Sequence, residues 1–306
     1  MSNTKLNNAK TGKNDEFYTL YEDVEKEVVY YTAELENKVV YCNCDNPQYS
    51  NFYKYFKDNF HNLKLKHLYS TGYNKEGNGY YGEYNGTREI IKPLINNGDF
   101  KSEECIEILK KSDVVITNPP FSLFREYIKQ LIKYNKQFLI IGNNNAISYK
   151  EVFPYIKDNK LWLGVNNNKM LEFVLPEKNK YCTREEIGGG YYGIVGCISW
   201  FTNIPHKSIN KPLILTKTYN PKEYPQYDNY CAIDVSKVAN IPMDYKGIMG
   251  VPITFLNKYN PEQFEIIGIT ENADYIKHLY KPNQSKYDRG YIKGKRKYAR
   301  ILIKKK

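Results

Sequence analysis

The segment Asp113–Arg125 reads DVVITNPPFSLFR, and it decides the fold. Its first five residues are mostly apolar and β-branched, which is typical of a fully buried strand. The strand runs directly into Asn118–Phe121 (NPPF). An amphipathic helix is predicted next, because one side of it would carry Leu123, Phe124, Tyr127, Ile128, Leu131 and Ile132. A buried strand, a rigid turn and a helix in this order indicate an α/β sheet with parallel strands.

Strands and helices alternate on both sides of this segment. The apolar patterns predict strands at 38–44, 65–69 and 137–141, and helices at 23–35, 49–60 and 103–111. Residues 71–87 are rich in Gly, Asn and Tyr and predict a loop or a hairpin. We therefore expect a doubly wound, Rossmann-like sheet from about residue 38 to 165.

The pattern changes beyond about residue 185. Glycine-rich turns, strand-like runs and prolines replace the helical periods there, which predicts a mixed or β-rich region. We expect three parts in the chain: a flexible N-terminus at 1–16, an α/β domain at 17–185, and a mixed or β-rich region at 186–306 that packs on it.

Composition narrows the class of protein. The chain of 306 residues has a formal net charge of +11, which suggests a polyanionic partner. Lys, Asn, Tyr and Ile are all abundant, however, as in translated AT-rich genes, so the charge alone does not distinguish nucleic-acid binding from codon bias. No apolar run approaches the 18 residues of a membrane span, and no signal peptide is visible, so we expect a cytoplasmic protein.

The six cysteines are expected to be reduced thiols. Cys42 and Cys44 alternate within a strand-like run, and no second pair of Cys or His stands at zinc-ligand spacing. We expect buried thiols and no metal site.

The NPPF tetrapeptide carries the chemistry. Two prolines fix an extended path and remove two backbone donors, which leaves the Asn118 side-chain oxygen and the Pro119 carbonyl as acceptors. Such a pair suits a planar amino group, and Phe121 offers a flat face on which a base can stack, worth about 1–3 kcal/mol. The alternative is a Pro-Pro turn at a strand end followed by a core phenylalanine.

The tetrapeptide resembles the (D/N/S)-P-P-(Y/F) motif of methyltransferases that act on the amino group of adenine or cytosine. The surroundings are similar to one branch, the EcoRI-type adenine-specific modification methylases. The similar stretches are NDEFYT (14–19), VYCNCDNP (40–47), GDF (98–100), DVVITNPPFSLFR (113–125), FLIIGNNNAI (138–147), WFTN (200–203) and GIMGVPITF (247–255). The resemblance covers most of the chain. It implies a site-specific transferase that moves a methyl group from S-adenosylmethionine to N6 of a flipped-out adenine in DNA.

The resemblance also implies roles for individual residues. It places the cofactor against Phe17, Tyr18, Thr19, Asn43, Asp45, Pro47, Asp99, Phe100 and Asn118, and the catalytic motif at Asn118, Pro119, Pro120 and Phe121. Phe17–Thr19 would line the methionine end, and the Asp99 carboxylate would accept from the adenine amino group of the cofactor. The other readings stay open: Asp99 as a helix cap, Asp45 as a turn residue, and Phe17 and Tyr18 as surface packing.

The sequence departs from the general methyltransferase pattern at two points. No F-x-G-x-G follows the first strand, and no clear acidic residue ends the strand at 65–69 to bind a ribose. The cofactor assignments therefore rest on the resemblance and not on generic spacing.

A base inside a duplex must be flipped out before its amino group can be methylated, so contacts with double-stranded DNA are required. We predict that the basic C-terminal stretch supplies them through Lys293, Lys295, Arg296, Lys297 and Arg300. A solvated strand and terminus is the alternative. We further expect a monomer, and a cognate restriction endonuclease that acts on the same DNA site without forming a stable complex.

Two other classes remain open. The same motif serves methyltransferases of RNA adenine or of protein glutamine, and a relative without catalysis could bind DNA alone. A bifunctional restriction enzyme is set aside, because the chain shows no P-D…(D/E)-x-K nuclease cluster.

Overall fold

The computed structural model describes residues 18–167, 169–175, 178, 182–186, 190–206, 211–282 and 289–306. Their contacts divide the chain into two compact units. The first unit combines the chain up to Ala146 with Leu163–His206, and the second combines Ile147–Trp162 with Lys207–Lys306. Within the described part of the chain, every helix is too short or too polar to cross a membrane.

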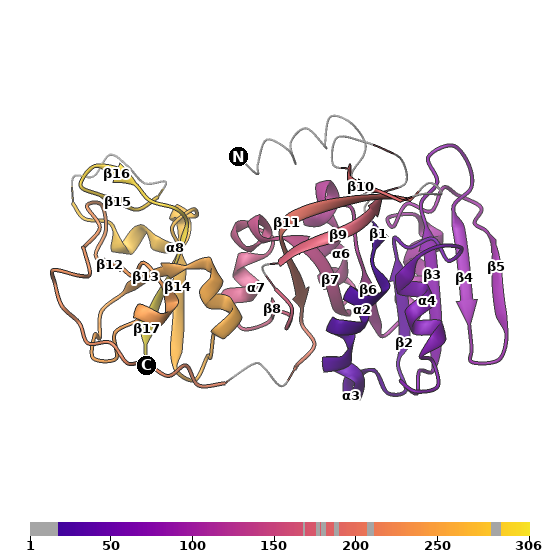
Figure 1. The fold of residues 1–306 in the computed structure, drawn as a ribbon, viewed down its shortest axis with the longest axis horizontal. Helices are drawn as coiled ribbons and strands as arrows, with labels where there is room; N and C mark the ends of the chain where they lie inside the picture. Colours follow the sequence, from indigo (N-terminus) through magenta and orange to yellow (C-terminus); the bar gives the residue numbers. More distant parts are fainter. Residues whose placement is uncertain are drawn as a thin grey trace. The chain divides into compact units, whose positions relative to one another are not determined.

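A large mixed sheet forms the first unit (Figure 1). Over the described residues its strand order is β1-β9-β11-β7-β6-β2-β3-β4-β5, with β8 and β10 also paired to β11. The strands are β1 (Tyr18–Thr19), β2 (Val39–Asn43), β3 (His67–Gly72), β4 (Tyr80–Tyr84), β5 (Glu89–Pro93), β6 (Val114–Thr117), β7 (Gln137–Asn143), β8 (Trp162–Leu163), β9 (Lys169–Leu175), β10 (Cys182–Glu185) and β11 (Tyr191–Thr202). The central strands β3, β2, β6 and β7 are parallel, which confirms the α/β class.

Helices cover both faces of the parallel strands. One face packs against α2 (Tyr21–Val28), the 3-10 turn η1 (Val29–Tyr31), α3 (Thr32–Leu35) and α4 (Asn51–Asp58), whose apolar residues share a core with alternate strand residues such as Val40, Cys42 and Ile116. The opposite face carries α5 (Glu103–Lys111) and α6 (Phe124–Lys133). There the Cys105 thiol meets the Thr71 hydroxyl, and the Tyr127 hydroxyl meets the Asn43 carbonyl.

The first predicted helix, 23–35, is divided in the structure. It changes from α to 3-10 at Val29 and back to α at Thr32, while its apolar residues Val24, Val28, Tyr31 and Leu35 are all fully buried. The residues predicted as a loop or hairpin at 71–87 contain β4, which pairs antiparallel with both β3 and β5.

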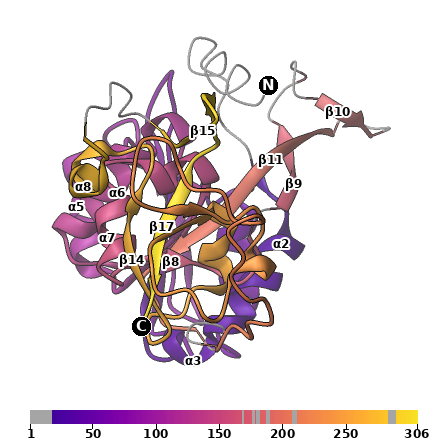
Figure 2. The same cartoon turned by 90° about the vertical axis from the view of Figure 1, so that its left-hand side faces the viewer.

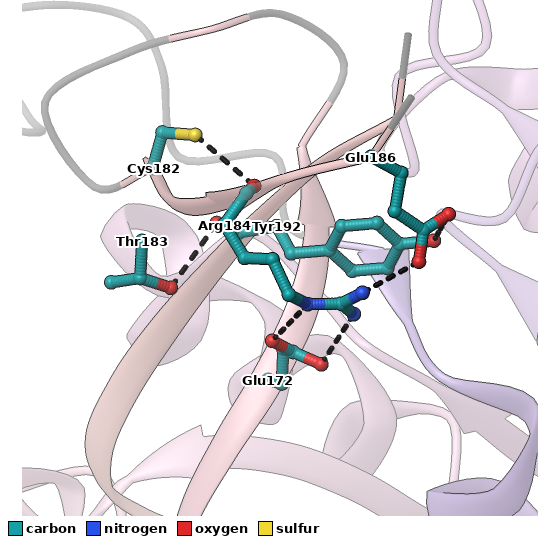
Figure 3. A network of polar contacts seen from close by, with 6 residues as sticks. All are labelled: Glu172, Cys182, Thr183, Arg184, Glu186 and Tyr192. Atoms are coloured by element: carbon teal, nitrogen blue, oxygen red, sulfur yellow. Dashed lines mark hydrogen bonds and ion pairs between the residues drawn. The ribbon is translucent and has the colours of Figure 1, made fainter. Parts of the chain in front are cut away.

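The antiparallel strands β9, β10 and β11 extend the sheet beyond β7. Arg184 of β10 fastens them, because its guanidinium forms two hydrogen bonds with the Glu172 carboxylate of β9 and a further one with Glu186 (Figure 3). The guanidinium also lies over the Tyr192 ring at 3.9 Å. Arg184 and Glu186 are exposed, so each of these pairs contributes little to stability on its own. The pair with Glu172 links β10 to β9, and β9 pairs in turn with β1 through Tyr18↔Val174 and Thr19↔Phe173.

The second unit contains a four-stranded sheet of order β12-β13-β17-β14 over the residues that are described. Its strands are β12 (Ile233–Asp234), β13 (Met249–Pro252), β14 (Phe264–Ile269) and β17 (Arg300–Lys305), and Figure 2 shows β17 alongside β14. A two-stranded hairpin, β15 (Tyr291–Ile292) and β16 (Lys295–Arg296), stands apart from this sheet. The second unit also contains short helices, namely α7 (Phe153–Lys157), α8 (Ala273–Ile276), and the 3-10 turns η4 (Val238–Asn240), η5 (Ile253–Lys258) and η6 (Lys277–Leu279). Two further 3-10 turns are η2 (Phe121–Leu123) in the first unit and η3 (Asn144–Ser148), which crosses the boundary between the units.

The two compact units do not coincide with the expected boundary after residue 185. Strand β11 lies beyond that boundary, yet it pairs with β7 in the first sheet, whereas Ile147–Trp162 belongs with the second unit. The strand-like composition of 191–202 is visible in the sequence, but its partner strand is not. The resemblance implies an S-adenosylmethionine-binding catalytic domain at 17–185 and a target-recognition and DNA-binding region at 186–306, and this functional division stays a prediction.

Glu27 is a buried carboxylate that holds α2 against the loop after β8. Its oxygens accept hydrogen bonds from the Tyr31 hydroxyl (2.9 Å) and from the backbone N–H groups of Val165 and Asn166 (2.7 Å each). Burial raises the pKa of Glu27, and these three donors oppose that rise. Gly164 leaves room for the contact, since a Cβ there would collide with the carboxylate.

Replacing Glu27 with alanine should lower the free energy of unfolding by about 3 kcal/mol, because three donors lose their acceptor at a buried position. Glu25→Ala, on the exposed side of the same helix, is the matched control and should change stability by less than about 0.5 kcal/mol. Urea denaturation measures both. Equal stabilities of the two variants would contradict the role given to Glu27.

Candidate functional site

Strands β2, β6 and β7 are parallel neighbours, so their carboxyl ends meet at one edge of the sheet. Ligands bind at this edge in open α/β sheets. Asn43 ends β2, Asn118 follows β6, and Asn143 ends β7. The predicted cofactor strand and the predicted catalytic tetrapeptide are thereby brought together.

The Asp45 carboxylate connects these two segments. One oxygen accepts a hydrogen bond from the Ser50 hydroxyl (2.6 Å), and the other accepts from the Thr117 hydroxyl. The backbone N–H of Asn118 also donates to this carboxylate. Ser50 is in turn the N-cap of α4, where its oxygen accepts from the N–H groups of Phe52 and Tyr53. Asp45 is therefore more than a turn residue: it joins the start of α4 to the start of the NPPF segment.

Burial raises the pKa of Asp45 to about 6, against the lowering effect of its three donors. The side chain is 6% exposed. Burial disfavours the charged carboxylate, while the hydrogen bonds favour it, so the acid titrates within reach of neutral pH. Burial raises the pKa of the neighbouring thiols Cys42 and Cys44, and the charge of the Asp45 carboxylate raises it further.

The end of β2 is held by two hydroxyl groups. The Asn43 carbonyl lies 2.7 Å from the Thr117 hydroxyl, whose single proton it shares with the Asp45 carboxylate, and it accepts from the Tyr127 hydroxyl (3.1 Å). The Tyr127 ring lies edge-on to Phe100, with ring centroids 5.0 Å apart. Phe100, which the resemblance places beside the adenine of the cofactor, is 4% exposed in this structure.

Asp99 lies in a tight turn beside the end of β2. Gly98 adopts a positive φ of 79°, and a Cβ there would collide with the Gly72 carbonyl. Gly72 itself approaches Asn46, since a Cβ at Gly72 would lie 2.7 Å from the Asn46 Cα. Helix α5 is capped by Ser102 and not by Asp99, so the capping alternative for Asp99 is wrong. The Asp99 carboxylate accepts from the Lys101 N–H within the turn.

The predicted N-terminal cofactor segment lies next to α4. Phe17 is outside the described residues. The Asn51 side chain donates to the Thr19 carbonyl (2.9 Å), and the Tyr18 and Tyr49 hydroxyls lie 3.1 Å apart. Pro47 packs under Gly82 of β4, where a Cβ would lie 2.5 Å from the proline ring. Tyr18, Thr19 and Pro47 are thus attached to the elements that flank the end of β2.

Three buried polar atoms around this strand end have no hydrogen-bond partner within the described structure: Thr19 Oγ1, Asn43 Nδ2 and Asn46 Nδ2. Their side chains are 3%, 0% and 3% exposed. Buried polar groups are nearly always hydrogen-bonded in native proteins, so such a group at a candidate site indicates a missing ligand or water. Two amide N–H donors and one hydroxyl are thus available, which fits a polar cofactor with acceptors such as carboxylate and hydroxyl groups.

Pro120 of the NPPF segment has the extended backbone that the Pro-Pro pair predicts, with φ −54° and ψ 124°. Pro119 is buried, Asn118 and Phe121 are half-buried, and Phe121 begins the 3-10 turn η2 ahead of α6. Phe121 also packs against the core of the first unit. Within the part of the chain that the structure describes, no cluster of His, Cys, Asp and Glu side chains could hold a metal ion.

Comparison with known proteins decides the family. The family model described as adenine-specific methyltransferase EcoRI matches residues 5–306. The chain is 48% identical to the type II methyltransferase M.EcoRI of Escherichia coli, over 100% of this chain and 97% of that protein. It is 42% identical to M.MgeORF184P of Mycoplasma genitalium and 40% identical to M.MpnI of Mycoplasma pneumoniae, over 98% of each chain in both cases. The chain belongs to the EcoRI family of adenine-specific methyltransferases.

This membership confirms the activity: the protein is a type II DNA adenine methyltransferase of a restriction-modification system. No solved structure matches the chain.

The basic residues predicted to contact DNA divide into two groups in this family member. Lys293, Lys295 and Arg296 are exposed on the β15–β16 hairpin or its turn, and Lys297 follows half-buried. Arg300 lies elsewhere: its Nε donates to the Asp234 carboxylate at 3.0 Å, and its side chain is only 13% exposed. This buried ion pair gives no support to a DNA contact by Arg300.

The sequence reasoning missed Thr117 and Tyr127 as parts of the site. It also placed the start of the helix at residue 49, whereas α4 begins at Asn51 with Ser50 as its N-cap. Thr117 and Tyr127 gave no local signal, because their partners Asp45 and Asn43 lie 72 and 84 residues away in the sequence.

Stability should depend on pH through Asp45. The unfolded carboxyl ionises near pH 3.8, whereas the folded one retains its proton up to about pH 6. The native state therefore binds more protons between these values, and its free energy of unfolding falls as the pH rises from about 4 to 6. Asp45→Asn removes this dependence. The stability difference between wild type and variant should change by roughly 3 kcal/mol over that range and be constant above pH 7.

Denaturant unfolding at several pH values measures this difference. Glu27, whose pKa is also raised, is present in both proteins, so its contribution cancels. A difference that is independent of pH between 4 and 7 would show that Asp45 does not titrate in this way.

Proposed function

We propose that the protein transfers a methyl group from S-adenosylmethionine to N6 of an adenine that is flipped out of double-stranded DNA at a specific site. One observation carries the proposal: the Asp45 carboxylate accepts from both the Thr117 hydroxyl and the Asn118 N–H, and so joins the predicted cofactor strand to the predicted catalytic motif.

Thr19, Asn43 and Asn46 would hold the cofactor through their unsatisfied polar atoms, with Asp99 and Phe100 at the adenine end. When bound, S-adenosylmethionine supplies an electrophilic methyl group whose sulfonium leaves as a neutral thioether, so the adenine amine has only one proton to lose. Asp45 keeps the two binding segments in register, and proximity and alignment then account for much of the rate.

Asn118 and Pro119 would hold the target amino group. The Asn118 side-chain oxygen and the Pro119 carbonyl would each accept a hydrogen bond from one N–H of this group. These two hydrogen bonds draw electron density onto the nitrogen and orient its lone pair towards the methyl group. Pro120 keeps this path extended, because its ring fixes φ and it has no N–H to donate. The proton released after transfer passes to solvent.

Phe121 would stack on the flipped base. Its ring is half-buried against the core and therefore held in place before the base arrives. Flipping costs a few kcal/mol of lost base stacking, which contacts elsewhere on the DNA must offset. We assign these contacts to Lys293, Lys295, Arg296 and Lys297, which neutralise phosphates.

The cellular setting follows from the substrate. We propose a cytoplasmic monomer, since methylation of one strand at a time requires a single active site. A cognate endonuclease would recognise the same DNA site without a stable complex between the two proteins.

The first test is methyl transfer from labelled S-adenosylmethionine to AT-rich plasmid DNA, followed by nucleoside analysis. N6-methyladenine is the expected product. Label found only in RNA or in protein would contradict the DNA substrate, and cofactor binding without transfer to any DNA would favour a relative that binds DNA without catalysis.

Asn118→Ala should reduce methyl transfer by at least about 100-fold, because the target amine loses an acceptor that acts in the transition state. Cofactor affinity, measured by calorimetry, should change little. A variant with near-normal turnover would remove Asn118 from the catalytic role.

Phe121→Ala should weaken capture of the flipped base by about 1–3 kcal/mol while duplex binding changes less. Fluorescence of 2-aminopurine at the target position reports the flipped base. Equal fluorescence from variant and wild type would count against stacking by Phe121.

A further inference from the structure

The β15–β16 hairpin of the second unit is built on an unusual turn. Tyr291 pairs with Arg296 and Ile292 with Lys295, which leaves Lys293 and Gly294 as a two-residue loop. Both have positive φ, 49° for Lys293 and 73° for Gly294. This is the type I′ turn that matches the twist of a tight hairpin.

Lysine is a poor choice for the first position of such a turn. A type I′ turn favours Asn, Asp or Gly there, because other side chains are strained at positive φ. Strained residues persist where the surrounding structure fixes them, and they gather at functional sites. Turn geometry therefore does not explain the lysine at position 293, whose side chain is exposed at the tip of the hairpin.

Asp228 fixes the turn from outside the hairpin. One of its carboxylate oxygens accepts from the Lys293 N–H (3.1 Å), and the other accepts from the Gly294 N–H (2.8 Å). The Asp228 N–H in turn donates to the Tyr291 carbonyl at 2.7 Å. Both donors of the turn are thus satisfied by one side chain, 65 and 66 residues away in the sequence.

The base of the hairpin is equally fixed. The Asn229 side chain accepts from the Tyr291 N–H (3.1 Å) and donates to the Arg289 carbonyl (2.7 Å). Gly290 lies against the stacked, buried rings of Tyr227 and Tyr230, where a Cβ would collide with both. A hairpin with so few pairs is marginal alone, so these contacts make it a rigid projection.

The projection is basic. Lys293, Lys295 and Arg296 are exposed, and the Tyr298 side chain is 82% exposed close behind them. The major groove of B-DNA admits a two-stranded ribbon, and lysine and arginine are the side chains that bind phosphates and guanine edges.

We propose that the β15–β16 hairpin enters a groove of the DNA duplex, that Lys293 contacts the DNA from its tip, and that Asp228 is a positioning residue for this tip. The proposal rests on the proposed function as a DNA enzyme and adds the element that engages the duplex.

Substitution of Asp228 is a sharp test, because its charge and its hydrogen bonds have opposite effects on DNA affinity. A carboxylate beside a DNA-binding tip repels phosphates, so a purely electrostatic role predicts tighter DNA binding when it is neutralised. Loss of the turn predicts weaker binding. We expect Asp228→Asn to bind a fluorescein-labelled AT-rich duplex about 5-fold more weakly, as for the loss of one phosphate contact. The Lys293 and Gly294 amides should exchange hydrogen faster than in wild type.

Binding at wild-type strength or tighter would overturn the positioning role. So would weaker binding with unchanged hydrogen exchange at both turn amides, since the tip would then have kept its conformation.

Lys293→Asn separates stability from function. Asparagine suits a type I′ turn, so the free energy of unfolding should be equal to or higher than that of wild type. DNA affinity should fall about 5-fold at physiological salt, and the slope of log affinity against log salt should decrease by about 0.9. Lys66→Asn is the matched control: Lys66 is exposed just before β3, at the amino end of the parallel strands, away from the candidate site. It should leave both affinity and slope unchanged.

The outcomes also separate this inference from the proposed function. If wild type binds and methylates DNA while Lys293→Asn shows the wild-type affinity and salt slope, the hairpin inference and the DNA contact of Lys293 are wrong, and the methyl-transfer function stands. If wild type neither binds nor methylates the duplex, the proposed function itself has failed.

Discussion

The rest of the site depends on the buried Asp45 carboxylate, which accepts three hydrogen bonds. One comes from Ser50, the cap of α4, and the other two come from the Thr117 hydroxyl and the Asn118 N–H at the start of the NPPF segment. Methyl transfer requires the methyl group and the target nitrogen to be aligned about 3 Å apart. In most Rossmann-like sites a glycine-rich loop brings backbone close to the cofactor. Here the Asp45 carboxylate and its hydroxyl partners join the two segments that we propose to bind the cofactor and the target base.

Most of the central sheet could be predicted from the sequence, because its strands are marked by local runs of apolar residues. The apolar runs at 38–44, 113–117 and 137–141 form parallel strands, and the Pro-Pro pair fixes the path at Asn118 whatever surrounds it. The resemblance to a family supplied the activity, which composition alone left open, and the comparisons confirm it.

Contacts between distant segments could not be predicted from the sequence. Nothing local shows that residues 191–202 pair with β7 and not with the second sheet, or that Asp228 holds the hairpin turn. In the sequence Arg300 looks like one more member of a basic tail, but its guanidinium is largely buried and pairs with the Asp234 carboxylate. Charge and periodicity describe residues that are close in the sequence. Strand pairing and contacts between distant side chains depend instead on the folded structure.

The pairing of β1 with β9 has a consequence for synthesis of the chain. Tyr18 and Thr19 leave the ribosome early, but their partners Val174 and Phe173 follow about 150 residues later. At a translation rate of about 5–20 residues per second, the delay is about 8–30 s. Until then the β1 segment has no strand to join. If Tyr18 and Thr19 line the methyl-donor site as proposed, a nascent molecule completes that site only after more than half of the protein has emerged.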